Sequence, residues 1–354
     1  MAAFSIDIST KTLQFLQPAG TSRGVYLTRK IYLITLTDNE NPALVGVGEC
    51  APLPDLSVDA MPDADYEQLL RNFCEAFQAT GVIDYVSMHN YPSMLFGLET
   101  ALAQYRAGGN YNFFNTRFGN GEVGIPINGL VWMGTFDEMY QRIEEKINQG
   151  YRCIKLKIGA IDFQKELELI RFIRLNFTQE ELEIRVDANG AFTPEEAMSR
   201  LDELAKYELH SIEQPIRSRQ PTEMARLCLS SPLPIAFDEE LIGVSRREQK
   251  IELLEKLHPH YIVVKPSLHG GMVGAEEWIT LANERSIGSW ITSALESNIG
   301  LHAIAQLTAK IYGDHFPMPQ GLGTGQLFAN NIPMPLEIRN NALWFLNVQQ
   351  SNNH

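Results

Sequence analysis

The sequence predicts an α/β protein in which a (β/α) barrel of the TIM type carries an α+β capping domain. Between residues 123 and 325, short β-rich segments alternate with amphipathic helical ones at a repeat of roughly 25–30 residues, which is typical of a parallel βα array. Before residue 123 the pattern is an antiparallel sheet followed by helices, and after residue 325 hairpin patterning returns. We therefore expect a cap at 1–122, a barrel at 123–325, and a C-terminal return at 326–354 that packs on the cap.

Composition excludes several classes of function. The chain has 354 residues and a formal net charge of −14, which argues against a nucleic-acid partner because such proteins usually carry a basic face. No apolar run is long enough for a membrane helix, and the first residues lack a basic segment followed by an apolar one, so we expect a cytoplasmic protein without membrane contact. The cysteines (Cys50, Cys74, Cys153 and Cys228) show no CxxC spacing and are predicted to be free, mostly buried thiols.

Alternating apolar and polar residues predict the strands of the cap, and longer amphipathic stretches predict its helices. Expected strands lie at residues 4–8, 12–16, 30–37 and 45–49, and expected helices at 64–79 and 93–107. The last two strands form a hairpin around the polar turn Asp38-Asn39-Glu40-Asn41. A second hairpin, 336–338 with 343–346 around Asn340-Asn341, makes up the C-terminal return.

Eight strands and the helices between them predict the barrel. The strands are expected at 125–131, 153–158, 184–187, 211–214, 235–238, 261–265, 289–293 and 320–323. The helices include 136–149, 163–177, 194–207, 246–257, 275–285 and 300–312. A doubly wound open sheet is the rival fold. It usually has a glycine-rich turn after its first strand, and residues 128–134 match that turn poorly.

Three consecutive barrel strands end in an acid, namely Asp187, Glu213 and Asp238. The carboxyl ends of barrel strands meet at one face, where barrel active sites lie. Three unpaired carboxylates repel one another there, and a hard divalent cation resolves the repulsion. Oxygen ligands without His or Cys favour Mg²⁺ over zinc. We therefore predict Mg²⁺ as the cofactor, bound by Asp187, Glu213 and Asp238.

Three lysines belong to the same face of the barrel. Lys155 and Lys157 are two residues apart in one strand and point the same way, whereas an isolated Lys-x-Lys is also typical of a solvated edge strand. Lys265 ends an apolar strand, where a buried ammonium needs a polar cavity. Because the second and sixth strands of an eight-stranded barrel lie opposite each other, we expect Lys157 and Lys265 on two sides of a bound molecule.

This arrangement predicts proton abstraction next to a carboxylate. Such a carbon acid is too weak to ionise in water, and Mg²⁺ together with a cationic lysine stabilises the enediolate that forms. A lysine crowded by a second lysine and a divalent ion loses its proton more readily, so Lys155 supports Lys157 as the base. Lys155, Lys157 and Lys265 are the predicted catalytic residues.

Three further side chains are candidates for supporting or substrate contacts. Asn189 is expected to orient a ligand or bind a metal-bound water, and Glu239 to hydrogen-bond a lysine. Arg23 is a candidate partner for a substrate carboxylate, which arginine can grip through two hydrogen bonds. An exposed loop arginine without such a role is the alternative.

Five motifs together resemble the enolase superfamily, in its muconate-lactonising-enzyme subgroup, and the resemblance covers nearly the whole chain. They are Lys155-Leu156-Lys157, Asp187-Ala188-Asn189-Gly190, Ile212-Glu213-Gln214-Pro215, Phe237-Asp238-Glu239 and Val264-Lys265-Pro266. Within that subgroup the chain is most similar to the o-succinylbenzoate synthase family. Residues 48–54, 22–24 and 293–300 resemble that family's glutamate–proline loop, mobile specificity loop and substrate-adjacent segment.

The resemblance implies a Mg²⁺-dependent dehydratase of menaquinone biosynthesis that acts on a small-molecule carboxylate, a succinyl-hydroxycyclohexadiene carboxylate. In this reading Lys157 removes the α-proton and then protonates the departing hydroxide on the same face, while Lys265 stabilises the enediolate from the other face. Ser293 and Glu296 are the implied substrate-binding residues of the seventh-strand segment.

Two alternatives remain open at the level of sequence. The same two lysines suit a racemase of N-acylated amino acids or a dipeptide epimerase, since those reactions also begin with α-proton abstraction. Dipeptide epimerases typically carry Asp-x-Asp on the last strand to hold an amino group, whereas Gly321-Leu322-Gly323-Thr324 contains no acid. That difference favours a substrate without an ammonium group. A metal-binding scaffold without turnover is the other alternative.

Overall fold

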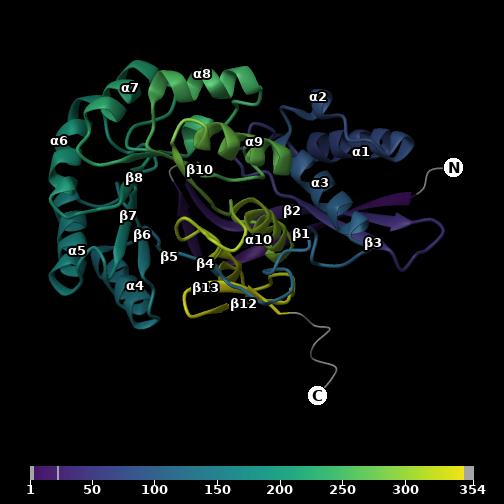
Figure 1. The fold of residues 1–354 in the computed structure, drawn as a ribbon, viewed down its shortest axis with the longest axis horizontal. Coiled ribbons are helices and arrows are strands. Elements are labelled where there is room, and N and C mark those ends of the chain that lie inside the picture. The colour runs from purple at the N-terminus through teal and green to yellow at the C-terminus, as the bar shows by residue number, and fades with distance from the viewer. Residues whose placement is uncertain (1–3, 22–23, 347–354) are drawn as a thin grey trace.

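A curled parallel sheet surrounded by helices adjoins a smaller antiparallel sheet with helices of its own in the computed structural model (Figure 1). The structure describes residues 4–21 and 24–346. This mixed α/β architecture confirms the predicted fold class. The division into 1–122, 123–325 and 326–354 remains a prediction.

The cap contains a three-stranded antiparallel sheet in the order β1-β2-β3. Its strands are β1 (Phe4–Thr21), β2 (Gly24–Asp38) and β3 (Val45–Cys50), and its helices are α1 (Asp63–Thr80), α2 (Tyr85–Met88) and α3 (Pro92–Arg106). The strands expected at 4–8 and 12–16 are in fact one strand, because residues 9–11 pair with β2 without a break. Their polar side chains conceal this continuity in the sequence.

Helix α3 lies directly against β3 and is buried along most of its length. Glycines make this close approach possible, since a Cβ added at Gly48 would overlap the backbone oxygen of Gly97. The core of the cap therefore depends on direct backbone contact between β3 and α3 at Gly48 and Gly97.

Replacing Gly48 by alanine is expected to lower the free energy of unfolding by about 1–3 kcal/mol, as overpacking of a well-packed core does. Urea unfolding measures this change. The control is Ser9→Ala on exposed β1 of the same sheet, which should leave the unfolding midpoint unchanged. A Gly48→Ala protein as stable as the parent would show that α3 can move away at little cost.

Seven parallel strands form the barrel sheet, in the order β11-β10-β9-β8-β7-β6-β5. They are β5 (Gly129–Val131), β6 (Cys153–Lys157), β7 (Glu183–Asp187), β8 (Ser211–Glu213), β9 (Ile235–Phe237), β10 (Tyr261–Val264) and β11 (Gly288–Ile291). The connecting helices are α4 (Phe136–Asn148), α5 (Phe163–Asn176), α6 (Pro194–Ala205), α7 (Pro221–Ser230), α8 (Arg247–Leu257), α9 (Gly271–Asn283) and α10 (Asn298–Tyr312). Short 3₁₀ turns, η1 (Glu239–Leu241) and η2 (Thr324–Leu327), follow β9 and the last barrel segment.

The eighth expected strand, 320–323, is reduced to a two-residue bridge. Gln320 pairs with Ile127 and Gly321 pairs with Thr292, both in parallel fashion. Backbone hydrogen bonds run from this segment to residues on both sides, including Asn128 N to Gln320 O and Ser293 N to Gly321 O. The segment therefore contacts both edges of the curled sheet.

The first expected barrel strand, 125–131, is divided between two sheets. Residues 129–131 form β5, whereas β4 (Ile125–Pro126) joins β12 (Leu336–Arg339) and β13 (Ala342–Phe345) in a separate sheet of order β12-β13-β4. The C-terminal hairpin thus pairs with β4 rather than with the sheet of the cap. The preceding segment contacts the sheet of the cap, where Phe328 pairs with Phe15 of β1, and Phe345 of the hairpin contacts the rings of Tyr111 and Phe118.

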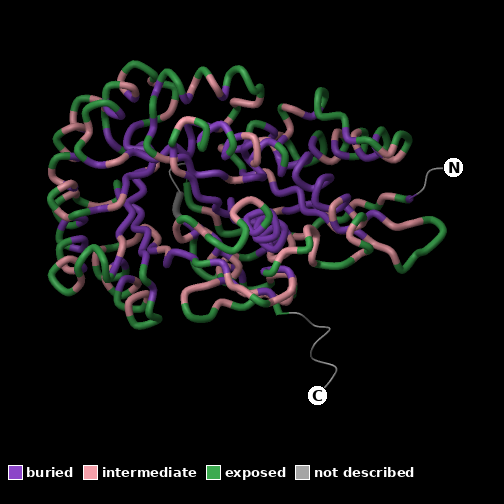
Figure 2. Tube along the Cα trace, in the orientation of Figure 1, coloured by how far each residue is buried: buried purple, intermediate pink, exposed green. Residues whose placement is uncertain are grey.

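Buried residues concentrate along the barrel strands and on helices α3 and α10 (Figure 2). Helix α10 contacts β3, so one barrel helix lies against the sheet of the cap. All four cysteines are free and buried, as expected. Across the described ranges 4–21 and 24–346, no helix combines the length and apolar character needed to cross a lipid bilayer.

Candidate active site

Strand register brings the predicted acids and lysines to one edge of the barrel sheet. Lys157 of β6 pairs with Asp187 of β7, which pairs with Glu213 of β8. Asp238 follows β9, two residues after the residue that pairs with Glu213. Lys157, Asp187 and Glu213 are the last residues of their strands and Asp238 directly follows β9, so the backbone of each strand places the charge at its carboxyl end.

Lys155 lies between two of the acids. Its Nζ is 2.6 Å from Glu213 Oε2 and 2.9 Å from Asp187 Oδ2, and all three side chains are nearly inaccessible to solvent. Burial by itself would lower the pKa of Lys155, but Asp187 and Glu213 outweigh it and the pKa is raised above its usual value. Lys155 is therefore a fixed cation of the site.

Lys157 is held differently, by one acid and one amide. Its Nζ donates to Asn189 Oδ1 at 2.6 Å and to Asp187 Oδ2 at 3.2 Å. The same ammonium lies 5.5 Å from the ring centroid of Trp132. Asn189 in turn donates from Nδ2 to Glu239 Oε1 at 3.1 Å, so Glu239 orients the amide that holds Lys157.

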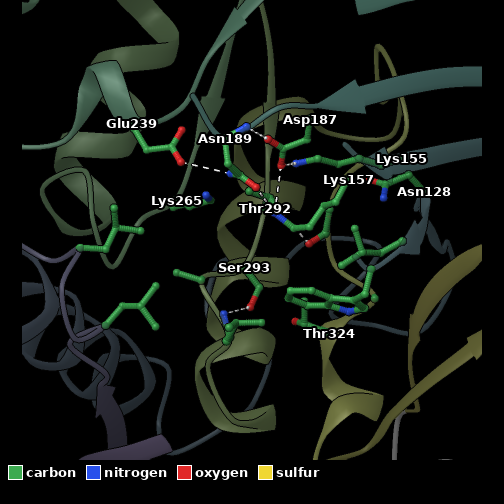
Figure 3. A pocket seen from close by; sticks show the side chains of 18 of the residues that line it. Asn128, Lys155, Lys157, Asp187, Asn189, Glu239, Lys265, Thr292, Ser293 and Thr324 are labelled. Atoms are coloured by element: carbon green, nitrogen blue, oxygen red, sulfur yellow. Dashed lines mark hydrogen bonds and ion pairs between the residues drawn. The ribbon is translucent and has the colours of Figure 1, made fainter. Parts of the chain in front are cut away.

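Lys265 reaches the site from β10, and three strands of the sheet separate it from β6. Its Nζ forms an ion pair with Asp238 Oδ2, and its backbone N–H donates to Nδ1 of buried His269 at 2.9 Å. Figure 3 shows Lys265 on one side of Asp187 and Asn189, with Lys155 and Lys157 on the other. The expected placement of lysines on two sides of one cavity is thus present.

The acids differ in how readily they ionise. Burial disfavours the charge on Asp187, but Lys155 and Lys157 outweigh it and hold the pKa of that carboxyl below its usual range. Burial and then the neighbouring Asp187 raise the pKa of Glu213. Burial and the adjacent Asp238 likewise raise the pKa of Glu239. The raised pKa values of Glu213 and Glu239 thus follow first from burial and then from the neighbouring acids.

The donor set fits a hard divalent cation. Glu213 Oε1 and Asp238 Oδ1 are buried and have no hydrogen-bond partner within the described part of the chain, and the three acids offer oxygen atoms alone. As it stands, no three His, Cys, Asp or Glu side chains among residues 4–21 and 24–346 form a coordination shell. Instead, lysine ammonium groups contact each of the three acids.

Two family models match the chain. The model described as enolase C-terminal domain-like matches residues 138–344, and the model described as MenC, N-terminal domain, matches residues 22–105. The o-succinylbenzoate synthase of Desulfotalea psychrophila is 44% identical over 96% of this chain and 98% of the relative. The chain belongs to the o-succinylbenzoate synthase family of the enolase superfamily.

Solved structures agree with membership of the o-succinylbenzoate synthase family. The crystal structure of MenC from Desulfotalea psychrophila aligns with a TM-score of 0.81 and 41% identity, and the alignment covers 97% of this chain and 99% of that one. A dipeptide epimerase from Enterococcus faecalis, complexed with Mg and a dipeptide, aligns with a TM-score of 0.82 at 17% identity over 98% and 97% of the two chains, which shows a shared fold. As a member of the o-succinylbenzoate synthase family, the chain is a hydro-lyase.

In this member of the o-succinylbenzoate synthase family, a cavity of about 820 Å³, including its mouth, lies over the lysines. Of the predicted residues, Lys155, Lys157, Asp187, Asn189, Glu239, Lys265 and Ser293 line it. Glu213 and Asp238 lie behind the lysines that contact them. Arg23 falls outside the described residues.

The structure does not place Glu296 among the residues that line the cavity. Its carboxylate is fully buried and accepts hydrogen bonds from Ser267, Ser293 and Ala294 N. The loop after β11 therefore turns this acid toward the chain itself, and its contact with substrate stays a prediction.

Several lining residues were not anticipated from the sequence. They are Tyr26, Leu56, Asn128, Leu130, Trp132, Thr292, Gly321, Gly323 and Thr324, whereas Leu53, Ala294 and Leu295 also line the cavity and belong to the segments 48–54 and 293–300 that the family resemblance had singled out. Trp132 and Thr292 directly follow β5 and β11, whereas Asn128 directly precedes β5, and none of the three carries a charge that would have marked it in the sequence. Leu53 and Leu56 come from the cap loop after β3, so both parts of the fold enclose the cavity (Figure 3).

Proposed function

We propose that this chain converts 2-succinyl-6-hydroxy-2,4-cyclohexadiene-1-carboxylate to 2-succinylbenzoate and water, a step of menaquinone biosynthesis. The observation that carries the proposal is the 44% identity to an o-succinylbenzoate synthase over nearly the full length of both chains. The cavity supports the proposal, because lysine ammonium groups border the cavity from two sides and could bind a substrate carboxylate.

Mg²⁺ is the proposed cofactor, and Asp187, Glu213 and Asp238 would hold it. When bound, Mg²⁺ stabilises the negative charge that grows on the substrate carboxylate as the neighbouring carbon loses its proton. The unpartnered oxygens of Glu213 and Asp238 support this assignment. The ammonium groups that now contact these acids would have to withdraw from them.

Lys157 is the proposed base, acting from its neutral amine form. Its Nζ takes the α-proton, and the electrons of that C–H bond pass into the ring carboxylate. The same ammonium then gives its proton to the hydroxyl oxygen as the C–O bond breaks, so that water leaves from the same face and a ring double bond forms. The product ring is aromatic, which makes the elimination favourable.

The remaining charged side chains support these steps. Lys265 would face the opposite side of the bound ring and offset its developing negative charge. Lys155, the neighbour of Lys157 on β6, would contribute positive charge rather than proton transfer. Asn189, itself oriented by Glu239, would hold Nζ of Lys157 in place between the two proton transfers.

A spectrophotometric assay with the cyclohexadiene acid, with and without Mg²⁺, tests the proposal. Turnover that requires Mg²⁺ is the expected result, and no turnover with the metal present would overturn the assigned substrate. Incubation of N-succinyl amino acids in D₂O tests the racemase alternative, which predicts α-deuteration with inversion. A protein inactive in both assays, and unaffected in metal binding by loss of either Lys157 or Lys265, would favour the scaffold alternative.

A further inference from the structure

A carboxylate of the cap is buried against the start of a barrel helix. Glu49, near the end of β3, has no solvent exposure. Its Oε1 accepts from Ser297 N at 2.8 Å, and its Oε2 accepts from Gly300 N at 2.9 Å and from the Ser297 hydroxyl. These donors belong to the first turn of α10 and to its N-cap residue. A carboxylate of the capping domain therefore accepts the hydrogen bonds that the start of this helix would otherwise leave unpaired.

The contact between Glu49 and the start of α10 is closely packed around Gly300. A Cβ added at Gly300 would lie 2.6 Å from Cβ of Glu296 and 3.1 Å from Glu49 Oε2. Glycine at position 300 therefore lets the two acids and the helix backbone approach one another. Glu49 and Glu296 are both fully buried at this junction.

Glu296 fixes the loop that precedes α10. Its Oε2 accepts from Ser293 Oγ at 2.5 Å and from Ala294 N at 2.7 Å, and Ser293 Oγ accepts from Leu295 N at 3.1 Å. Leu295 has a φ of +67°, a conformation that a leucine adopts only when its surroundings impose it. Ser293, Ala294 and Leu295 all line the cavity.

Arg29 of β2 joins the two acids electrostatically. It is 3% exposed, and its pKa is lowered by burial while Glu296 and Glu49 oppose that shift. Its Nη2 donates to Ala51 O at 2.6 Å, at the start of the cap loop that carries Leu53 and Leu56 into the cavity. One cation thus lies with two carboxylates at the junction of the cap and the barrel.

These contacts hold one part of the cavity wall. In Figure 3 Ser293 lies on the side away from Asp187 and Lys155. Leu53, Ala294 and Leu295 also belong to one apolar cluster. Loss of the Glu49 contacts would separate Leu53 of the cap from Ala294 and Leu295 of the barrel loop. The strand pairing that places Lys155 and Lys157 would stay unchanged.

We propose that Glu49 is a positioning residue that fixes the apolar, cap-side half of the substrate cavity by joining β3 to the loop at 293–297. The inference rests on the proposed function, since it takes this cavity to be the substrate site. It assigns to Glu49 an effect on how firmly the substrate is held rather than on the proton transfers at Lys157.

The test compares Glu49→Gln with the parent enzyme in steady-state kinetics with Mg²⁺. Gln keeps the shape but loses the charge opposite Arg29 and turns an amide toward the donors of α10. We expect KM to rise by about tenfold, the scale of losing a hydrogen-bonded charge, and kcat to change by less than about threefold. The affinity for 2-succinylbenzoate, measured by calorimetry, should fall in parallel. Glu40→Gln, at an exposed acid of the turn between β2 and β3, is the control and should match the parent.

Hydrogen exchange supplies a readout that does not depend on turnover. Segments 51–57 and 293–297 of Glu49→Gln should exchange faster, while β6 and β7 exchange as in the parent. An unchanged KM with normal exchange, or a fall in kcat alone, would overturn the proposal. If Glu49→Gln does not fold, Ser297→Ala removes one of the same hydrogen bonds. It should raise KM by about threefold, and an unchanged KM would be equally decisive. A parent enzyme without turnover would contradict the proposed function, whereas the exchange measurement would still report on the junction.

Discussion

Lys157→Ala is expected to lower kcat for water elimination by about 10³- to 10⁴-fold, the upper range for loss of a general base that also acts as the acid. The amine at this position would carry the proton in both steps, and Lys155, which also contacts Asp187, does not form the hydrogen bond to Asn189 that Lys157 forms. Single-turnover absorbance measurements with the cyclohexadiene acid separate this loss from any change in binding.

The matched control is Lys165→Ala on α5, where the lysine lies at the surface, pairs with Glu168 and lies over the ring of Phe136. That variant should keep the parent kcat. Calorimetric binding of 2-succinylbenzoate to Lys157→Ala shows whether its cavity is intact. A Lys157→Ala enzyme that binds product and turns over within about threefold of the parent rate would exclude Lys157 as the base.

Removal of divalent metal is expected to reduce turnover by at least about 10³-fold, because several kcal/mol of charge stabilisation would be lost. The enzyme is treated with a chelator, assayed, and then titrated with Mg²⁺, which should restore the rate. Asp238→Asn should need more Mg²⁺ for half-restoration, by at least about tenfold.

Asp202→Asn, at an exposed position on α6, provides the comparison and should need no more Mg²⁺ than the parent. Full activity in the chelated enzyme, confirmed metal-free by elemental analysis, would exclude the metal role assigned to Asp187, Glu213 and Asp238. If Asp238→Asn and the parent needed the same Mg²⁺ concentration, Asp238 would be excluded as a metal ligand, while Asp187 and Glu213 would remain candidates.

Charge is the property that made part of the site predictable from sequence. An acid or lysine that ends an apolar strand requires a reason for its burial, and Asp187, Lys157 and Lys265 could be identified on that basis. Asn128 and Thr292 carry no such signal, because a neutral side chain at a strand end is equally suited to a turn. Glu296 shows the opposite limit, since sequence does not reveal whether an acid faces a cavity or the chain's own backbone.

Periodicity predicted the barrel strands well where pairing is between neighbours in the sequence, as in β6 to β10. It was wrong where pairing depends on distant segments. Residues 125–131 read as one strand, yet Ile125 pairs with Leu343 in the C-terminal hairpin while 129–131 pair with β6. Residues 9–11 read as a break because they are polar, although their backbone pairs continuously with β2.

The short segment that touches both edges of the barrel sheet has a consequence for protein synthesis. Gln320 and Gly321 emerge from the ribosome after every lysine and acid of the site, and Gly321, Gly323 and Thr324 still form part of the cavity wall. A nascent or truncated chain that stops before residue 320 would carry all the catalytic groups yet lack a finished cavity. The cavity wall can therefore be completed only after translation has passed residue 324.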